Sequence, residues 1–152
     1  MDRSGAGPAV IDAGGRGLLR MFTDGASRGN PGHAAVGVMI QDQQGVEVEA
    51  ISRYVGLATN NEAEYLALLE GLRAAAAFGA QRLDIFMDSE LLVNQLNGSY
   101  KVREPRLMRL FLQARQQMQQ FGSVRIRHVP REQNRVADAL ANQALDERDP
   151  QA

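Results

Sequence analysis

The hydrophobic pattern of this chain changes its period near residue 59, and that change restricts the possible folds more than any other feature. Before it lie three β-rich segments, LLRMFTD, AAVGVMIQD and VEVEAISRYV, and Gln43-Gln44-Gly45 separates the second from the third. Such segments joined by short turns predict an antiparallel meander. After residue 59 the leucines follow a helical period instead, so we expect the meander to lead into a helix.

The pattern after the meander alternates between helices and strands. Thr59-Asn60-Asn61-Glu62 has the S/T-x-x-E form of a capping box, and four successive alanines continue the helix to Gly79. The later elements are a strand in RLDIFMD, a short helix in SELLVNQLNG, a longer helix over 104–121, a strand in SVRIRHV and a last helix in NRVADALANQALDE. The order βββαβααβα predicts an α/β fold with a five-stranded mixed sheet flanked by helices, its later strands parallel.

The length of the chain sets the domain organisation. A chain of 152 residues is within the usual size of one domain, and we expect a single domain over residues 18–147. Residues 1–17 are rich in glycine and show no sustained periodicity, which predicts a flexible N-terminal tail. Residues 148–152 are expected to form a frayed C-terminus.

The composition excludes several kinds of site. The chain has no cysteine and only two histidines, His33 and His128. Without cysteine there is no disulfide framework, no thiolate zinc site and no cysteine nucleophile, and two histidines make a histidine-built metal centre improbable. A bound metal must therefore be held by oxygen ligands.

Charge and hydropathy restrict the partners. The formal net charge is -1, which argues against a generally cationic nucleic-acid binder, although 16 of the 17 basic residues are arginine, the better phosphate ligand. No apolar run is long enough to span a bilayer, and the N-terminus lacks the basic-then-apolar order of a signal peptide. We therefore expect a soluble cytoplasmic protein with no membrane partner.

Two aspartates follow apolar strands in the same way. Asp24 ends FTD and Asp88 ends FMD, and open α/β sheets place functional groups beyond the ends of their strands. The structural alternative is that Asp24 forms an Asx-turn and that Asp88 caps the helix starting at Ser89. From spacing alone, this structural alternative is favoured.

Further acids lie on two predicted helices. Glu62 has a structural role as the capping-box partner of Thr59, whereas Glu64 has none and lies beside the apolar stripe, which suggests a cation as its partner. Asp138 lies at the margin of the buried stripe of the last helix. Asp146 is expected to be solvated.

Four segments decide between these interpretations because they occur together. TDGASRGNPG, TNNEAEY, DSELLVNQLNG and HVPREQNRVADALA stand in the order and at separations compatible with type 1 ribonuclease H, which the chain resembles over nearly all of residues 18–147. The resemblance implies the ribonuclease H fold, a five-stranded mixed sheet with flanking helices, and a catalytic domain over residues 18–147. It implies four catalytic, metal-binding carboxylates: Asp24, Glu64, Asp88 and Asp138.

The chemistry implied by the resemblance is hydrolysis of the RNA strand of RNA/DNA hybrids, giving 5′-phosphate and 3′-hydroxyl ends. Two Mg²⁺ ions, or Mn²⁺ in their place, would serve as cofactors, with Asp24 bridging them. Glu64 would also meet a ribose 2′-hydroxyl, the group that distinguishes RNA from DNA. The expected partner is an RNA/DNA hybrid, with duplex RNA as a further candidate, and the expected state is a monomer.

The family motifs also imply a set of substrate-binding residues. Small and short polar side chains would contact sugars, base edges and a DNA phosphate, and these are Gly25, Ala26, Ser27, Asn30, Thr59, Asn60 and Asn61. The structural alternatives are that Asn30 is a turn residue and that the asparagine pair only caps a helix.

Two departures from the family pattern affect the site. Many members carry a histidine in the loop before the last acid, but here His128 follows the alternating strand and Arg131 lies in the loop. We expect Arg131 to face the phosphate, with His128 as a second candidate. The chain also lacks the basic, tryptophan-containing protrusion and resembles the shorter variant, with Lys101 and three arginines as partial substitutes.

Two alternative functions remain open. One is a hybrid-binding module without turnover, although degenerate members usually lose an acid and this chain keeps all four. The other is a related nuclease on the same fold, of the resolvase or transposase type. The asparagine-rich TNNEAEY segment favours ribonuclease H over these relatives.

Overall fold

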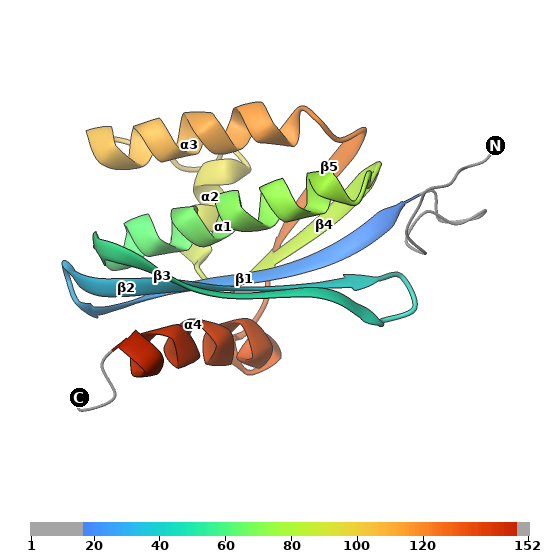
Figure 1. The fold of residues 1–152 in the computed structure, drawn as a ribbon. Coiled ribbons are helices and arrows are strands. Elements are labelled where there is room, and N and C mark those ends of the chain that lie inside the picture. The colour runs from blue at the N-terminus through green and yellow to red at the C-terminus, as the bar shows by residue number, and fades with distance from the viewer. Residues whose placement is uncertain (1–16, 149–152) are drawn as a thin grey trace.

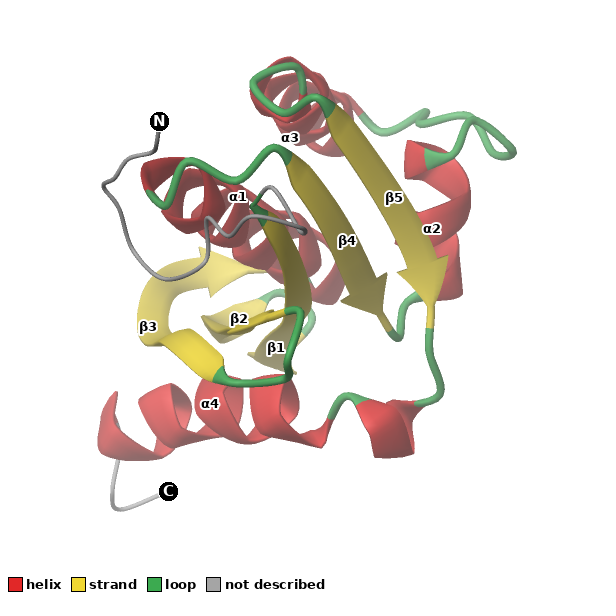
Figure 2. Ribbon diagram, turned by 90° about the vertical axis from the view of Figure 1, so that its right-hand side faces the viewer, coloured by secondary structure: helices red, strands yellow, loops and turns green. Residues whose placement is uncertain are grey.

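A computed structural model describes residues 17–148 as one sheet with helices on both faces. The five strands have the order β3-β2-β1-β4-β5. Helices α1, α2 and α3 lie on one face, and α4 lies alone on the other (Figures 1 and 2). The predicted tail up to residue 16 and the predicted frayed end from residue 149 lie outside the described residues.

The first three strands form the predicted antiparallel meander. They are β1 (Leu18–Gly29), β2 (Gly32–Asp42) and β3 (Glu47–Ala58). β2 lies between β1 and β3 and pairs with both in antiparallel register. The last two strands are β4 (Arg82–Met87) and β5 (Ser123–His128). β4 lies between β1 and β5 and pairs with both in parallel register. The predicted order and the mixed sheet are therefore confirmed.

β1 continues beyond the point where the sequence pattern places its end. Its parallel pairing with β4 stops at Phe22 and Phe86, but its antiparallel pairing with β2 runs on to Gly29 and Gly32. The expectation that Asp24 ends its strand, with a turn directly after it, is wrong. Asp24 lies within β1, because β2 continues to satisfy the backbone hydrogen bonds of this segment.

Two of the helices described, α1 and α2, begin directly after a residue whose side chain caps them. The described helices are α1 (Asn60–Ala77), α2 (Glu90–Leu96), α3 (Pro105–Met118) and α4 (Arg135–Arg148), with a short 3₁₀ turn η1 (Arg131–Gln133) before α4. Both bonds of the predicted capping box between Thr59 and Glu62 are present. α2 is capped by the Ser89 hydroxyl, which accepts from the Leu92 N–H, so the alternative in which Asp88 is the cap is wrong. That leaves the Asp88 carboxylate available for the site.

The main hydrophobic core fills the space between the sheet and α1, α2 and α3. Leu68 and Leu72 of α1 pack there against Met21 and Ile85 of the sheet, and all four are at most 1% exposed. A buried side chain of this size stabilises the fold by about 1.5–3 kcal/mol relative to an exposed one. No helix within residues 17–148 is both long and apolar enough to cross a membrane.

Two glycines let helices approach the sheet closely from both faces. A Cβ atom on Gly25 of β1 would lie 2.2 Å from the Ala63 carbonyl carbon of α1, and one on Gly37 of β2 would lie 2.0 Å from the Ala137 oxygen of α4. Gly37 is the cross-strand partner of Asp24. The backbone therefore brings α1 and α4 together around Asp24, in contacts that no larger residue permits.

Candidate active site

Three carboxylates from three different elements meet beside β1. Asp24 lies on β1, Glu64 on α1 and Asp88 directly after β4, and one oxygen of each lies within 4.8 Å of the others. Asp24 is only 6% exposed, and the other two are half-buried. These residues are 40 and 24 positions apart in the chain, so the fold brings together acids that local sequence leaves separate.

The position of Glu64 depends on Gly25. The Gly25 N–H donates to Glu64 Oε1 at 3.2 Å. Tyr65, the next residue of α1, is fully buried, and its hydroxyl donates to Gln95 Oε1 of α2 at 2.6 Å. Burial raises the pKa of Tyr65, so this phenol remains a neutral donor. α1 is thus fixed at Glu64 and at Tyr65, and the Glu64 carboxylate lies beside Asp24.

Burial and the close approach of the acids raise the pKa values of Asp24 and Glu64. Burial raises the pKa of Asp24 to about 9, helped by the charges of Glu64 and Asp88 and by a hydrogen bond with Asp138. Burial also raises the pKa of Glu64 to about 8, with the Asp88 charge adding to the shift and the Gly25 N–H opposing it. Without a cation, the cluster therefore keeps protons that isolated carboxylic acids would lose.

The donor set fits a hard divalent cation. Its atoms are all carboxylate oxygens, which Mg²⁺ and Mn²⁺ prefer. Burial and, second to it, mutual repulsion raise the pKa values of Asp24 and Glu64, and a cation would offset both by stabilising the ionised carboxylates. The arrangement can therefore hold a divalent metal ion.

Asp138 lies beside this cluster rather than within it. It is in the first turn of α4, directly after Ala137, which packs on Gly37. It hydrogen-bonds with Asp24, but its oxygens do not complete the mutual group formed by Asp24, Glu64 and Asp88. The fourth predicted acid is thus brought to the site from the opposite face of the sheet.

A cleft of 410 Å³ surrounds the acids and contains part of the predicted site. Its lining comprises Asp24, Gly25, Ala26, Ser27, Asn60, Glu64, Asp88, Arg131, Asp138 and Asn142. Arg131, in η1, is thus in the cleft, whereas His128 is exposed at the end of β5 and does not line it. Asn30, Thr59 and Asn61 also lie outside this lining.

The polar residues of the predicted substrate-binding set brace the β1–β2 hairpin against the start of α1. Asn60 Oδ1 accepts from the Ser27 N–H at 3.1 Å, and Asn30 Oδ1 accepts from the Asn60 N–H at 3.0 Å. The Ser27 hydroxyl donates to the carbonyl oxygens of Ala58, at 2.8 Å, and Gly29. Asn30 therefore lies in the turn, as its structural alternative states, whereas Asn60 braces the hairpin and the cap of the helix is Thr59. The substrate contacts of both asparagines stay a prediction.

Two asparagines of the site were not singled out from the sequence. Asn134 is 1% exposed, and its Nδ2 donates to the Thr23 carbonyl at 2.9 Å and to Asp88 Oδ2 at 3.1 Å. Asn142 lines the cleft one helical turn after Asp138. The signal for Asn142 was its i+4 spacing from Asp138, which puts both on one helix face. Nothing local distinguishes Asn134 from an ordinary residue before a helix.

Comparisons with known proteins agree with this geometry. A family model described as reverse transcriptase-like matches residues 22–144. Ribonuclease HI of Halobacterium salinarum is 46% identical over 140 residues, which cover 91% of this chain and 70% of that protein. The chain belongs to the ribonuclease H family. The bifunctional protein Rv2228c of Mycobacterium tuberculosis is 44% identical over 124 residues, and the match spans only 34% of its length.

Solved ribonuclease H structures confirm the fold. The crystal structure of RNase H1 from Halobacterium salinarum superposes with a TM-score of 0.85 at 45% identity, covering 86% of this chain and 99% of that one. LC11-RNase H1, solved in complex with an RNA/DNA hybrid, gives a TM-score of 0.81 at 40% identity, covering 85% of this chain and 97% of that one. The predicted ribonuclease H fold is therefore confirmed.

Proposed function

We propose that this ribonuclease H is a metal-dependent endonuclease that hydrolyses the RNA strand of RNA/DNA hybrids and leaves 5′-phosphate and 3′-hydroxyl ends. The observation that carries the proposal is the meeting of Asp24, Glu64 and Asp88 in one polar cleft, with Asp138 beside them. The similarity to ribonuclease HI and to a relative solved with a hybrid supports the same substrate class.

The four acids are proposed as ligands of two divalent ions. Bound there, the ions would activate a water, neutralise charge on the scissile phosphate and stabilise the leaving oxygen. Asp24 is the proposed bridging ligand because it is the most buried of the three clustered acids and also contacts Asp138. Mg²⁺ is the proposed physiological ion, with Mn²⁺ as an effective substitute, since both accept oxygen-only ligands.

Other residues of the cleft are proposed to bind and orient the substrate. Gly25 and Ala26 carry little side-chain volume beside the acids, so an RNA strand can approach the backbone of β1 there. Glu64 has one oxygen engaged by Gly25, which leaves the other for a metal or a ribose 2′-hydroxyl. Arg131 offers a planar fork for a phosphate. His128 remains the second candidate for this loop.

The identity of the partner is part of the proposal. An RNA/DNA hybrid is the expected substrate, and cleavage of duplex RNA is a secondary expectation. A monomeric state and a cytoplasmic location remain predictions from the sequence. Asn30, Thr59 and Asn61 are proposed to contact the hybrid outside the cleft, on the surface formed by the hairpin and the start of α1.

The test is a cleavage assay with four labelled substrates: the hybrid, single-stranded RNA, duplex RNA and duplex DNA, each with Mg²⁺ and with Mn²⁺. We expect cleavage of the RNA strand of the hybrid, none without metal, and none by Asp24→Asn. Asp84→Asn is the matched control, because Asp84 lies on β4 outside the cleft. Absence of hybrid cleavage, or equal cleavage by Asp24→Asn, contradicts the proposal, and metal-independent hybrid binding without cleavage favours a binding module.

A further inference from the structure

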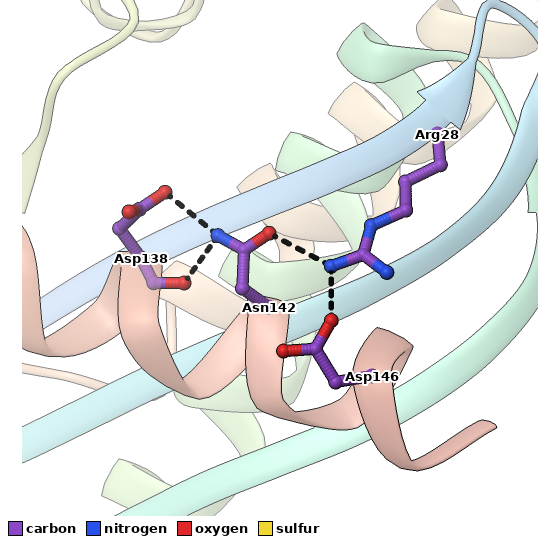
Figure 3. Close-up of polar contacts among 4 residues, drawn as sticks. All are labelled: Arg28, Asp138, Asn142 and Asp146. Atoms are coloured by element: carbon purple, nitrogen blue, oxygen red, sulfur yellow. Dashed lines mark hydrogen bonds and ion pairs between the residues drawn. The ribbon is translucent and has the colours of Figure 1, made fainter. Parts of the chain in front are cut away.

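A chain of polar contacts connects the fourth acid of the site to the β1–β2 hairpin (Figure 3). Asn142 Nδ2 donates to Asp138 Oδ1 at 3.3 Å and to the Asp138 carbonyl oxygen at 3.0 Å. Asn142 Oδ1 accepts from Arg28 Nη2 at 3.4 Å, and the same nitrogen forms an ion pair with Asp146 Oδ1 at 2.6 Å. Asp146, which the sequence suggested to be merely solvated, therefore has a partner.

The geometry of this chain follows from helical spacing. Asp138, Asn142 and Asp146 are four residues apart along α4, so they lie on one face, and Arg28 reaches them from β1. The amide of Asn142 has only one orientation that fits, because its Nδ2 faces two oxygens and its Oδ1 faces a guanidinium. Arg28 thereby fixes which end of the amide points toward Asp138.

Asp138 needs such a constraint more than the other acids do. Asp24 is buried within the sheet, Glu64 accepts from Gly25 and Asp88 accepts from Asn134. Asp138 is half-buried at the start of α4 and lies outside the group of three. Besides its hydrogen bond with Asp24, its carboxylate accepts from Asn142, which engages Oδ1 and leaves Oδ2 for the cluster.

We propose that Asn142 is a positioning residue that holds the Asp138 carboxylate toward the metal site, and that Arg28 acts through Asn142 by fixing its amide. The proposal rests on the proposed function, because it assigns a task to Asp138 as a ligand. Groups that orient a metal ligand through hydrogen bonds commonly change metal affinity or activity by about 10–100-fold when removed. Because Asn142 is half-buried, we expect the lower end of that range.

The alternative is that Asn142 forms only an ordinary bond on the helix surface. Gln143 offers a matched control, since its Nε2 donates to Glu147 Oε2 at 3.2 Å with the same i,i+4 spacing but outside the cleft. Removal of the Gln143 amide deletes one such bond, and removal of the Asn142 amide deletes two of them and the bond from Arg28. A purely structural role therefore predicts some loss of stability in both variants and unchanged metal affinity in both. Only a positioning role predicts a difference in metal binding.

The experiment titrates the metal-free full chain with Mn²⁺ by calorimetry and measures kcat and KM on the hybrid. For Asn142→Ala we expect about 10-fold weaker binding of the weaker Mn²⁺ ion and about 10-fold lower kcat, with KM changed less than twofold. For Gln143→Ala we expect all three values within twofold of wild type. Arg28→Ala should give a smaller loss, and Arg28→Ala/Asn142→Ala should equal Asn142→Ala alone, because Arg28 acts through the amide.

Each outcome is decisive. Wild-type Mn²⁺ affinity and turnover in Asn142→Ala overturn the positioning role, and so do equal losses in Asn142→Ala and Gln143→Ala. Additive losses in the double variant overturn the role of Arg28. A wild-type chain that binds Mn²⁺ but does not cleave the hybrid contradicts the proposed function alone, and the affinity difference still tests Asn142. A wild-type chain that binds no Mn²⁺ overturns both proposals.

Discussion

The two halves of β1 have different neighbours and different tasks. From Leu19 to Phe22 the strand pairs with β2 on one side and β4 on the other, and Leu19 and Met21 are fully buried in the main core. From Asp24 to Gly29 it pairs with β2 alone, and residues 24–27 line the cleft. The loss of one neighbouring strand opens space for carboxylates from α1, from the end of β4 and from α4.

One strand therefore stabilises the core with its first half and contributes to a site that destabilises the metal-free protein with its second half. The first half lowers the free energy of the fold by burying apolar side chains. The second half brings carboxylates together, which in the absence of a cation raises the free energy of the folded state. Substitutions of core residues in the first half should therefore lower stability and leave activity nearly unchanged. Substitutions of the clustered acids should lower activity and raise the stability of the metal-free protein, and the largest effects are expected there.

Glu64→Gln should nearly abolish activity while it stabilises the metal-free protein. The glutamine keeps an oxygen acceptor for the Gly25 N–H but removes the negative charge. We expect kcat to fall by about 10³-fold, which corresponds to about 4 kcal/mol of lost transition-state stabilisation. The metal-free melting temperature should rise by several degrees, as measured by calorimetry. A Glu64→Gln enzyme that stays active and melts at a lower temperature would contradict the proposed role.

Met21→Ala should show the opposite behaviour. Met21 is fully buried and packs over Gly71 of α1, so its truncation leaves a cavity in the main core. We expect a loss of about 2–5 kcal/mol in the free energy of unfolding, measured by urea denaturation. At temperatures where the variant stays folded, kcat should change less than about threefold. A large fall in kcat without a loss of stability would show that the two halves are not separate in function.

The stability of the metal-free protein should fall as the pH rises. Asp24 has its pKa raised from 3.8 to about 9 and Glu64 from 4.5 to about 8, so between these values the folded state holds protons that the unfolded state has lost. This contribution to stability is fully present below about pH 4 and is lost as the pH rises toward 9. We expect the free energy of unfolding to fall continuously over this range, with the two groups titrating as one coupled pair.

Chemical unfolding at a series of pH values, with and without Mn²⁺, measures this effect. Asp24→Asn should flatten the profile, and Mn²⁺ should reverse the loss at high pH because the cation binds the ionised acids of the folded state. Asp84→Asn, outside the cleft, should retain the wild-type slope. A wild-type profile that rises between pH 5 and 8 without metal would contradict the raised pKa values.

Much of the fold could be predicted from the sequence because its signals are local. The capping box at Thr59 and the period of the following leucines both depend on residues within a few positions of each other, and the structure confirms them. The continuation of β1 through DGASRG could not be predicted in this way. These residues have the composition of a turn, and only pairing with β2 and the approach of α1 at Gly25 make them a strand.

The prediction of the site depends on the family resemblance, because the contacts that form the site are also long-range. Spacing alone favoured structural roles for Asp24 and Asp88, because nothing local indicates that their strands are neighbours. Asp146 is 68% exposed, as expected of a solvated acid, but no local pattern indicates its ion pair with Arg28, which is 118 residues away in the chain. Such long-range contacts depend on the packing of α4 on β2, which Gly37 permits. The local sequence around Asp146 or Arg28 does not indicate that this packing brings the two residues together.

The smallest of these effects is expected at the far end of the second half of β1, where Asn60 braces the hairpin. Asn60→Ala removes the acceptor for the Ser27 N–H, an exposed hydrogen bond, and should cost about 0.5–1.5 kcal/mol of stability. If Asn60 also contacts the hybrid, as its place in the cleft suggests, KM should rise about 3–10-fold with kcat nearly unchanged. Asn97→Ala is the matched control, because Asn97 Nδ2 also forms an exposed bond, to the Ile126 carbonyl at 3.2 Å, away from the cleft. Equal KM values for the two variants would leave Asn60 with a structural role only, and the contrast between the halves of β1 would then concern the acids rather than the whole segment.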